Sequence, residues 1–112
     1  MDIIFRTSKL EKLCNNKSYR ERECGPVRAK LLGRRMDDLR ASTCLADIAR
    51  LPQTRCHELV KDRDGQISLD LDHPYRLIFT VANEPVPVKP DGGLDWSRVT
   101  AIKIMGVEDT HG

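Results

Sequence analysis

The sequence predicts a single α+β domain over residues 1–112, in which an N-terminal strand and two to three helices pack on a mostly antiparallel sheet of four to five strands. The length is enough for one hydrophobic core but not for two. Apolar residues follow helical spacing up to about residue 52 and alternate with polar residues after it. Helices that precede a set of strands favour a fold in which they cover one face of the sheet.

The first predicted elements are a strand and a helix. "DIIFRT" is rich enough in β-branched and aromatic residues for a short strand. Ser8, with Glu11 three residues later, has the form of a capping box, so a helix is expected to begin there.

Residues 26–40 form the clearest predicted helix. Its apolar residues recur at spacings that keep them on one face, namely Val27, Leu31, Leu32, Met36 and Leu39. Most of its charged residues lie elsewhere, as on a solvated surface. A short third helix, "TCLADIARL", is expected to end at Pro52.

The strands follow from a change of period. "RCHELV", "QISLDL" and "YRLIFTVA" are separated by short turns and predict an antiparallel meander. A long loop rich in Pro and Gly, residues 84–96, precedes a last strand, "RVTAIKIMGV". The apolar helix face is expected to cover the apolar strand faces, with Leu31, Leu32, Met36 and Leu39 against Ile67, Leu69, Leu77, Phe79 and Ile102.

Composition excludes several classes of function. The four cysteines form no CxxC or CxxH pair, so neither a zinc site nor a redox dithiol is expected. No apolar run approaches the ~18 residues of a membrane span, and the chain is expected to be cytoplasmic and to contact no membrane. The formal net charge of +2 means that any nucleic acid would have to bind local clusters of basic residues.

Polar groups of the predicted sheet should lie near one another. His57, Lys61 and Arg63 belong to the first strand of the meander and its turn, Arg76 belongs to the third strand, and the segment 109–111 follows the last strand. Arg76 is either an ordinary surface arginine or a cation that faces a site on the exposed side of the sheet. His57 is either a hydrogen-bonded structural residue or a catalyst, and the last residues are either a solvated tail or part of the site.

Four motifs, found in three segments, carry a resemblance to a known family. "RCHELVKDRDGQISLDL", "DHPYRLIFTV" and "VTAIKIMGVEDTHG" resemble the killer proteins of the HigB group in the RelE/ParE toxin superfamily. Those proteins show a histidine-leucine-lysine turn, a strand with Gly and Ser, a strand with Tyr-Arg and a carboxyl end close to Asp-Tyr-His. The resemblance extends over essentially the whole chain and implies a RelE-like fold.

The resemblance implies a toxin of a type II toxin-antitoxin system. Such a toxin is a metal-independent, ribosome-dependent endoribonuclease that cleaves translated mRNA and needs no cofactor. Its implied partners are the ribosome with mRNA and a cognate helix-turn-helix antitoxin, through which it would reach operator DNA.

The resemblance also implies roles for individual residues. Attack of a 2′-hydroxyl on the adjacent phosphate needs a proton acceptor, a proton donor and cations near the phosphoryl oxygens. By matching position, His57 and His111 look like the acid/base pair, Asp109 would orient a histidine and Arg76 would hold the phosphate. Lys61 and Arg63 would bind the RNA backbone.

Two alternatives stay open at this point. The first is a toxin-like protein with weak or no nuclease activity, which acts as a co-repressor bound to the antitoxin or on another target such as gyrase. Thr110, where the family often has tyrosine, and the position of Lys61 one residue later than in the family favour this alternative. The second is a small basic RNA-binding protein that uses Arg34 and Arg35.

Overall fold

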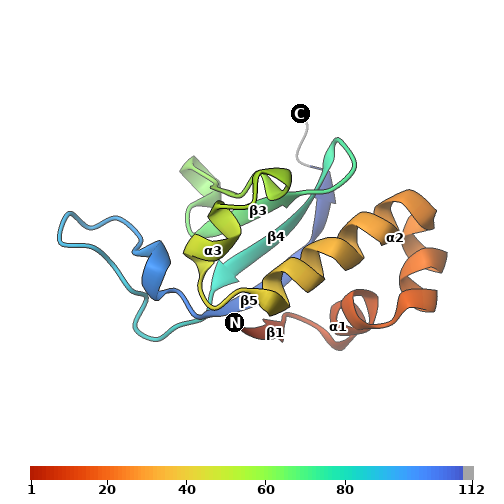
Figure 1. The fold of residues 1–112 in the computed structure, drawn as a ribbon, viewed down its shortest axis with the longest axis horizontal. Helices are drawn as coiled ribbons and strands as arrows, with labels where there is room; N and C mark the ends of the chain where they lie inside the picture. The colour runs from red at the N-terminus through yellow and green to blue at the C-terminus, as the bar shows by residue number, and fades with distance from the viewer. Residues whose placement is uncertain (110–112) are drawn as a thin grey trace.

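The computed structural model describes residues 1–109 and shows helices on one face of a five-stranded sheet (Figure 1). The strand order is β1-β5-β4-β3-β2; β1 pairs with β5 in parallel, and the other pairs are antiparallel. The predicted α+β fold is confirmed. The elements are β1 (Asp2–Phe5), α1 (Ser8–Asn15), α2 (Lys17–Ala41), α3 (Leu45–Ala49), β2 (His57–Glu58), β3 (Gln66–Asp70), β4 (Tyr75–Val81) and β5 (Ala101–Asp109), with short 3-10 turns η1 (Pro52–Thr54), η2 (Lys61–Arg63) and η3 (Trp96–Arg98).

Helix α1 begins where predicted but with a different cap. The N-cap is Thr7, whose Oγ1 accepts a hydrogen bond from the Leu10 amide at 3.1 Å. Ser8 is the first helical residue, so the expected Ser8–Glu11 capping box is wrong by one position. A threonine side chain satisfies the free amides of a first turn as a serine does, and the sequence offered both.

Helix α2 consists of two helical segments that meet at Gly25, where the backbone has φ 78° and ψ 164°. Pro26 then starts the second segment, because its fixed φ suits the first turn of a helix and its missing N–H is not needed there. Leu32, Met36 and Leu39 of this segment are fully buried, as predicted. Val27 is 65% exposed, so its assignment to the buried face is wrong: it lies in the first turn, beyond the sheet contact.

The chain turns sharply after α3. Thr54, in η1, is fully buried, and its hydroxyl donates to the carbonyls of Leu51 and Ile48 at 2.8 and 3.2 Å. Both carbonyls also accept backbone hydrogen bonds, Ile48 O from the Leu51 amide and Leu51 O from the Thr54 amide, so the buried hydroxyl adds a side-chain contact to an already bonded turn. The turn delivers the chain to β2 at the edge of the sheet.

The meander is confirmed, although β2 has only two residues. Register is continuous across it: His57 pairs with Ser68, Ser68 with Ile78, and Ile78 with Gly106. An irregularity at Ile78 and Phe79 shifts the pairing of β4 with β5. The predicted core is confirmed, because the named residues of α2, β3, β4 and β5 belong to one cluster, with Leu31 partly buried against it.

The long loop from Ala82 to Asp95 folds back on itself and projects beyond the sheet (Figure 1). Val88 and Leu94 form a β-bridge within it, and the indole Nε1 of Trp96 donates to Glu58 Oε1 at 2.7 Å. This bond ties the end of the loop to the two-residue strand β2. Within residues 1–109, no helix combines the length and the hydropathy that crossing a membrane would require.

Candidate functional site

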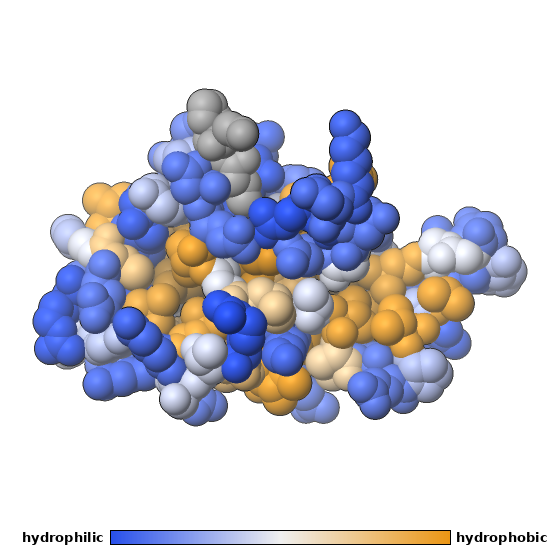
Figure 2. Space-filling view, turned by 180° about the vertical axis from the view of Figure 1, so that it is seen from behind, coloured by the Kyte–Doolittle hydropathy of each residue, from blue (hydrophilic) through white to orange (hydrophobic). Residues whose placement is uncertain are grey.

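The face of the sheet that the helices leave open carries the candidate site. Figure 2 shows the side of the molecule opposite to that of Figure 1, where hydrophilic side chains stand between hydrophobic patches. Strand alternation places His57, Ser68, Asp70, Arg76 and Glu108 on this face, because the register pairs them across neighbouring strands. The polar groups of four strands therefore meet on one surface.

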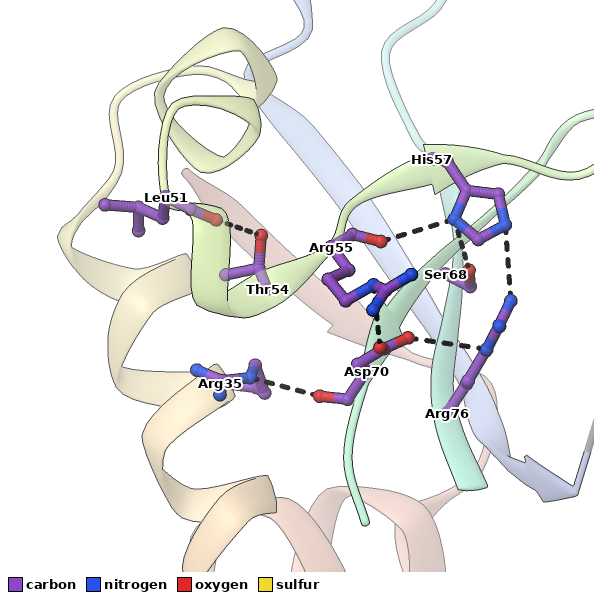
Figure 3. A network of polar contacts seen from close by, with 8 residues as sticks. All are labelled: Arg35, Leu51, Thr54, Arg55, His57, Ser68, Asp70 and Arg76. Atoms are coloured by element: carbon purple, nitrogen blue, oxygen red, sulfur yellow. Dashed lines mark hydrogen bonds and ion pairs between the residues drawn. The ribbon is translucent and has the colours of Figure 1, made fainter. Parts of the chain in front are cut away.

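His57 and Arg76 are in direct contact, although β3 separates their strands. Arg76 Nη1 lies 3.2 Å from His57 Nε2 (Figure 3). Ser68 stands between them on β3 and is fully buried. Its small side chain leaves room for the imidazole and the guanidinium to approach over it.

The contacts of His57 fix which ring nitrogen holds the proton. A guanidinium can only donate, so Nε2 must accept from Arg76. A carbonyl can only accept, and Arg55 O lies 3.2 Å from Nδ1, so Nδ1 carries the hydrogen. The Ser68 hydroxyl lies a further 3.5 Å from Nδ1. This geometry is that of the Nδ1–H tautomer, with an Nε2 lone pair directed at Arg76.

A carboxylate holds Arg76 from the opposite side (Figure 3). Asp70 Oδ1 lies 3.4 Å from Arg76 Nε, and Asp70 Oδ2 lies 3.3 Å from Arg55 Nε. Among the residues that the structure describes, Oδ1 is buried and accepts no hydrogen bond, so the link to Arg76 is an ion pair without one. Arg35 reaches the backbone carbonyl of Asp70 from α2 at 3.1 Å. Asp70 is thus held by contacts on both sides of the sheet.

The predicted RNA-binding residues differ in their surroundings. Arg63 donates to Gln66 Oε1 at 2.7 Å and to Glu108 Oε2 at 2.9 Å, which brings η2 against the end of β5. Lys61 begins η2 with φ 62° and an exposed side chain. The structure therefore brings Arg63 to the site and leaves Lys61 at its margin.

The end of β5 shows where two of the last acidic residues lie, Glu108 and Asp109. The strand continues to Asp109, and Glu108 rather than Asp109 is the register partner of Arg76. Asp109 is exposed and is the register partner of Tyr75. Strand alternation places both residues on the face of the sheet opposite to Arg76. His111 and Thr110 lie outside the described residues, so their predicted roles stay predictions.

Cys56, directly before His57, is not a nucleophile at neutral pH. Burial raises the pKa of its thiol to about 12, and the Glu58 carboxylate adds a smaller effect in the same direction. A thiol with so high a pKa holds its proton, and only a thiolate attacks efficiently. The neighbourhood of Cys56 and His57 therefore does not support cysteine-histidine chemistry.

The helix arginines are not equivalent. Arg35 is 6% exposed and is held by Asp38 and by the Asp70 carbonyl. Arg34 is exposed. A surface for RNA built on both residues is thus not available, which weakens the interpretation as a simple RNA-binding protein.

Sequence reasoning missed three residues of the site: Asp70, Arg55 and Glu108. Asp70 had a usable signal, because it and Arg76 flank a short turn and so face each other with opposite charges in any regular hairpin. Arg55 contributes its backbone carbonyl, which no pattern of side chains reveals. Glu108 was hidden because the strand was expected to stop at Val107.

The arrangement joins a proton acceptor to a cation on an accessible surface. The His57 side chain is exposed, and Arg76 is 31% exposed. Two cavities of about 390 and 410 Å³ lie elsewhere, and neither His57 nor Arg76 lines them. An imidazole lone pair beside a guanidinium suits a substrate that carries both an acidic proton and an anion.

Comparison with known proteins gives no family for this chain. No protein-family model matches the sequence, and no curated protein matches it.

Proposed function

We propose that this chain is the toxin of a type II toxin-antitoxin system and acts as a ribosome-dependent endoribonuclease on translated mRNA. One observation carries the proposal beyond the resemblance: His57 Nε2 and Arg76 Nη1 meet at 3.2 Å on the open face of the sheet. A general base and a phosphate-binding cation are the two groups that cleavage through a 2′-hydroxyl needs first.

The proposed reaction needs no metal, because the RNA supplies its own nucleophile. The phosphodiester binds Arg76, and His57 Nε2 accepts the proton of the 2′-hydroxyl as its oxygen bonds to phosphorus. The bond from phosphorus to the 5′-oxygen breaks, and His111 donates a proton to that oxygen. The products are a 2′,3′-cyclic phosphate and a free 5′-hydroxyl. Asp109 lies on the opposite face by strand alternation and is assigned no part in this step.

The proposed partners follow from the same function. Lys61 and Arg63 would contact the RNA backbone, and the ribosome would present mRNA to the open face of the sheet. A helix-turn-helix antitoxin would neutralise the toxin and link it to operator DNA. The protein would act in the cytoplasm, where ribosomes translate.

The test is induction of the chain without any antitoxin, followed by mapping of mRNA ends. We expect growth arrest and cuts within translated messages. His57→Ala, Arg76→Ala and His111→Ala should each lower cleavage by about 10²-fold or more, because each removes a proton-transfer group or the cation beside the phosphate. Arg34→Ala, which removes an exposed arginine of α2, is the matched control and should cleave normally. Equal cleavage by Arg76→Ala and Arg34→Ala would contradict the proposal.

A second candidate function is supported by a specific observation. Arg63 is already paired with Glu108 and Gln66, and Arg76 occupies the His57 lone pair, so the site is internally satisfied. A toxin-like protein that binds its antitoxin as a co-repressor, or acts on a target such as gyrase, needs no free base. Growth arrest with intact mRNA, or with DNA trapped on gyrase, would identify this alternative.

A further inference from the structure

Asp70 and Glu108 lie on either side of Arg76 on the open face, so Arg76 has two carboxylates with which it could pair. Arg76 lies in register between Asp70 of β3 and Glu108 of β5. Its ion pair is with Asp70, at 3.4 Å, whereas Glu108 is bound by Arg63 at 2.9 Å. Glu108 therefore pairs with Arg63, whereas Asp70 pairs with Arg76 through Oδ1 and with Arg55 through Oδ2.

This choice of partner decides where the Arg76 guanidinium is directed. Asp70 binds Nε, near the root of the guanidinium, and Nη1 then meets His57 Nε2. A guanidinium turned toward Glu108 would lie nearer β5, which is farther from β2 and His57. Asp70 thus holds Arg76 on the His57 side of β4.

We infer that Asp70 is a positioning residue, which holds Arg76 against His57 and thereby keeps the proton of His57 on Nδ1. The inference deepens the proposed function and rests on it for its catalytic consequence. The structural part, which concerns the tautomer of His57, stands on the contacts of Asp70, Arg76 and Arg55 alone. In the proposed reaction this tautomer keeps the Nε2 lone pair on the side of Arg76, where a bound phosphate would bring the 2′-hydroxyl.

Two further observations support a dedicated role for this carboxylate. Asp70 Oδ1 is buried, and the contact that the structure gives it is the ion pair with Arg76 Nε at 3.4 Å. The strand around it is fixed by Arg35, which binds the Asp70 carbonyl from the helix side. Both side-chain oxygens of Asp70 thus contact arginines, Arg76 and Arg55, while Arg35 fixes its backbone.

The test is Asp70→Asn, with Asp72→Asn as the matched control. Asp72 also pairs with an arginine, Arg28, at 3.0 Å, and the two carboxylates have similar exposure, 28% and 26%. The first readout is the pair of imidazole nitrogen resonances of His57 in a proton–nitrogen correlation spectrum, which distinguishes a protonated from a bare nitrogen. We expect Nδ1–H in the wild type and in Asp72→Asn, and a shift toward Nε2–H in Asp70→Asn.

The second readout is cleavage of ribosome-bound mRNA. Asp70→Asn should lower the maximal cleavage rate by about tenfold or more and change half-saturation by less than about threefold, because misplacement of a catalytic group lowers the chemical step more than binding. Asp70→Glu, which restores the charge, should recover part of the rate.

The outcomes are distinguishable. An unchanged Nδ1–H tautomer in Asp70→Asn would overturn the inference whatever the activity. A changed tautomer in a wild-type protein that cuts no mRNA would support the positioning role and refute the proposed nuclease. Should Asp70→Asn fail to fold, Asp70→Ser removes the same carboxylate and carries the same expectation.

Discussion

Cys14, at the end of α1, makes the stability of the protein vary with pH in the alkaline range. It is 1% exposed, and burial raises the pKa of its thiol to about 11, against a smaller opposing effect of Arg20. Because the pKa of Cys14 is higher in the folded than in the unfolded state, the folded protein keeps the thiol proton up to a higher pH. The contribution of this neutral thiol to the free energy of unfolding is fully present below the unfolded-state pKa of about 9. It is lost as the pH rises through the folded-state pKa of about 11.

We therefore predict that the free energy of unfolding falls by roughly 1 kcal/mol from this thiol between about pH 8 and about pH 10. The measurement is urea denaturation of the wild type and of Cys14→Ala at both pH values. The variant will be less stable throughout because it leaves a small cavity, but its stability should fall less steeply. Parallel slopes would show that Cys14 does not titrate as its burial requires.

For single residues, the sequence predicted the face of the sheet on which His57 and Arg76 lie but not the contact between them. Strand alternation places both on the open face, since it depends only on the period of two. Their contact depends on Ser68 being small enough for two long side chains to meet above it, and on a carbonyl at Arg55, where φ is 45°. A local pattern of residues contains neither fact.

Among the elements, α2 shows how one residue shapes a helix. Gly25 has a backbone conformation, φ 78° and ψ 164°, that is almost exclusive to glycine, and a Cβ built there would meet nothing within 4 Å. The bend at Gly25 sets the direction of the second segment, which carries Leu32, Met36 and Leu39 to the sheet.

Gly25→Ala should therefore destabilise the protein by about 1–3 kcal/mol through backbone strain, with no steric clash. Gly106→Ala is the matched control: its Cβ also has open space, and its backbone lies outside the left-handed region. It should change the free energy of unfolding by less than about 0.5 kcal/mol. Denaturant titration of both variants checks the difference, and equal losses would argue against strain at Gly25.

Element boundaries were predicted less well than element types, for physical reasons. The helix from residue 26 was visible because its apolar face has three buried residues at helical spacing. The segment before Gly25 has a largely polar surface, so it has no comparable pattern. Strand β2 was expected over six residues and has two. The register with β3 covers His57 and Glu58, and the Leu59 amide adds one bond to Gln66 O before η2 turns away.

For the molecule as a whole, the low net charge limits how it can meet RNA. A chain with a formal charge of +2 releases few counterions on binding, and Arg55, Arg63 and Arg76 are already paired with carboxylates. We predict that purified RNA without ribosomes is cleaved at least about tenfold more slowly than translated mRNA at physiological salt. The measurement is the cleavage rate of each substrate. Equal rates would show that cleavage does not depend on the ribosome.

The overall architecture was predictable because a single apolar helix face and alternating strand faces have few ways to cover each other. The parallel pairing of β1 with β5 was not, because it joins Asp2 to Ala101 across nearly the whole sequence and leaves no local signal. The choice of sheet neighbour is a property of the complete fold.

The position of β5 also constrains the order in which the protein can form during synthesis. β5 lies between β1 and β4, yet every other helix and strand precedes it in the sequence. Until β5 has left the ribosome, β1 has no neighbour in the sheet, and Glu108 is not in place to bind Arg63. Contacts of such long sequence separation form slowly. A nascent chain therefore passes through a period in which its amino-terminal strand is unpaired and the open face of its sheet is incomplete.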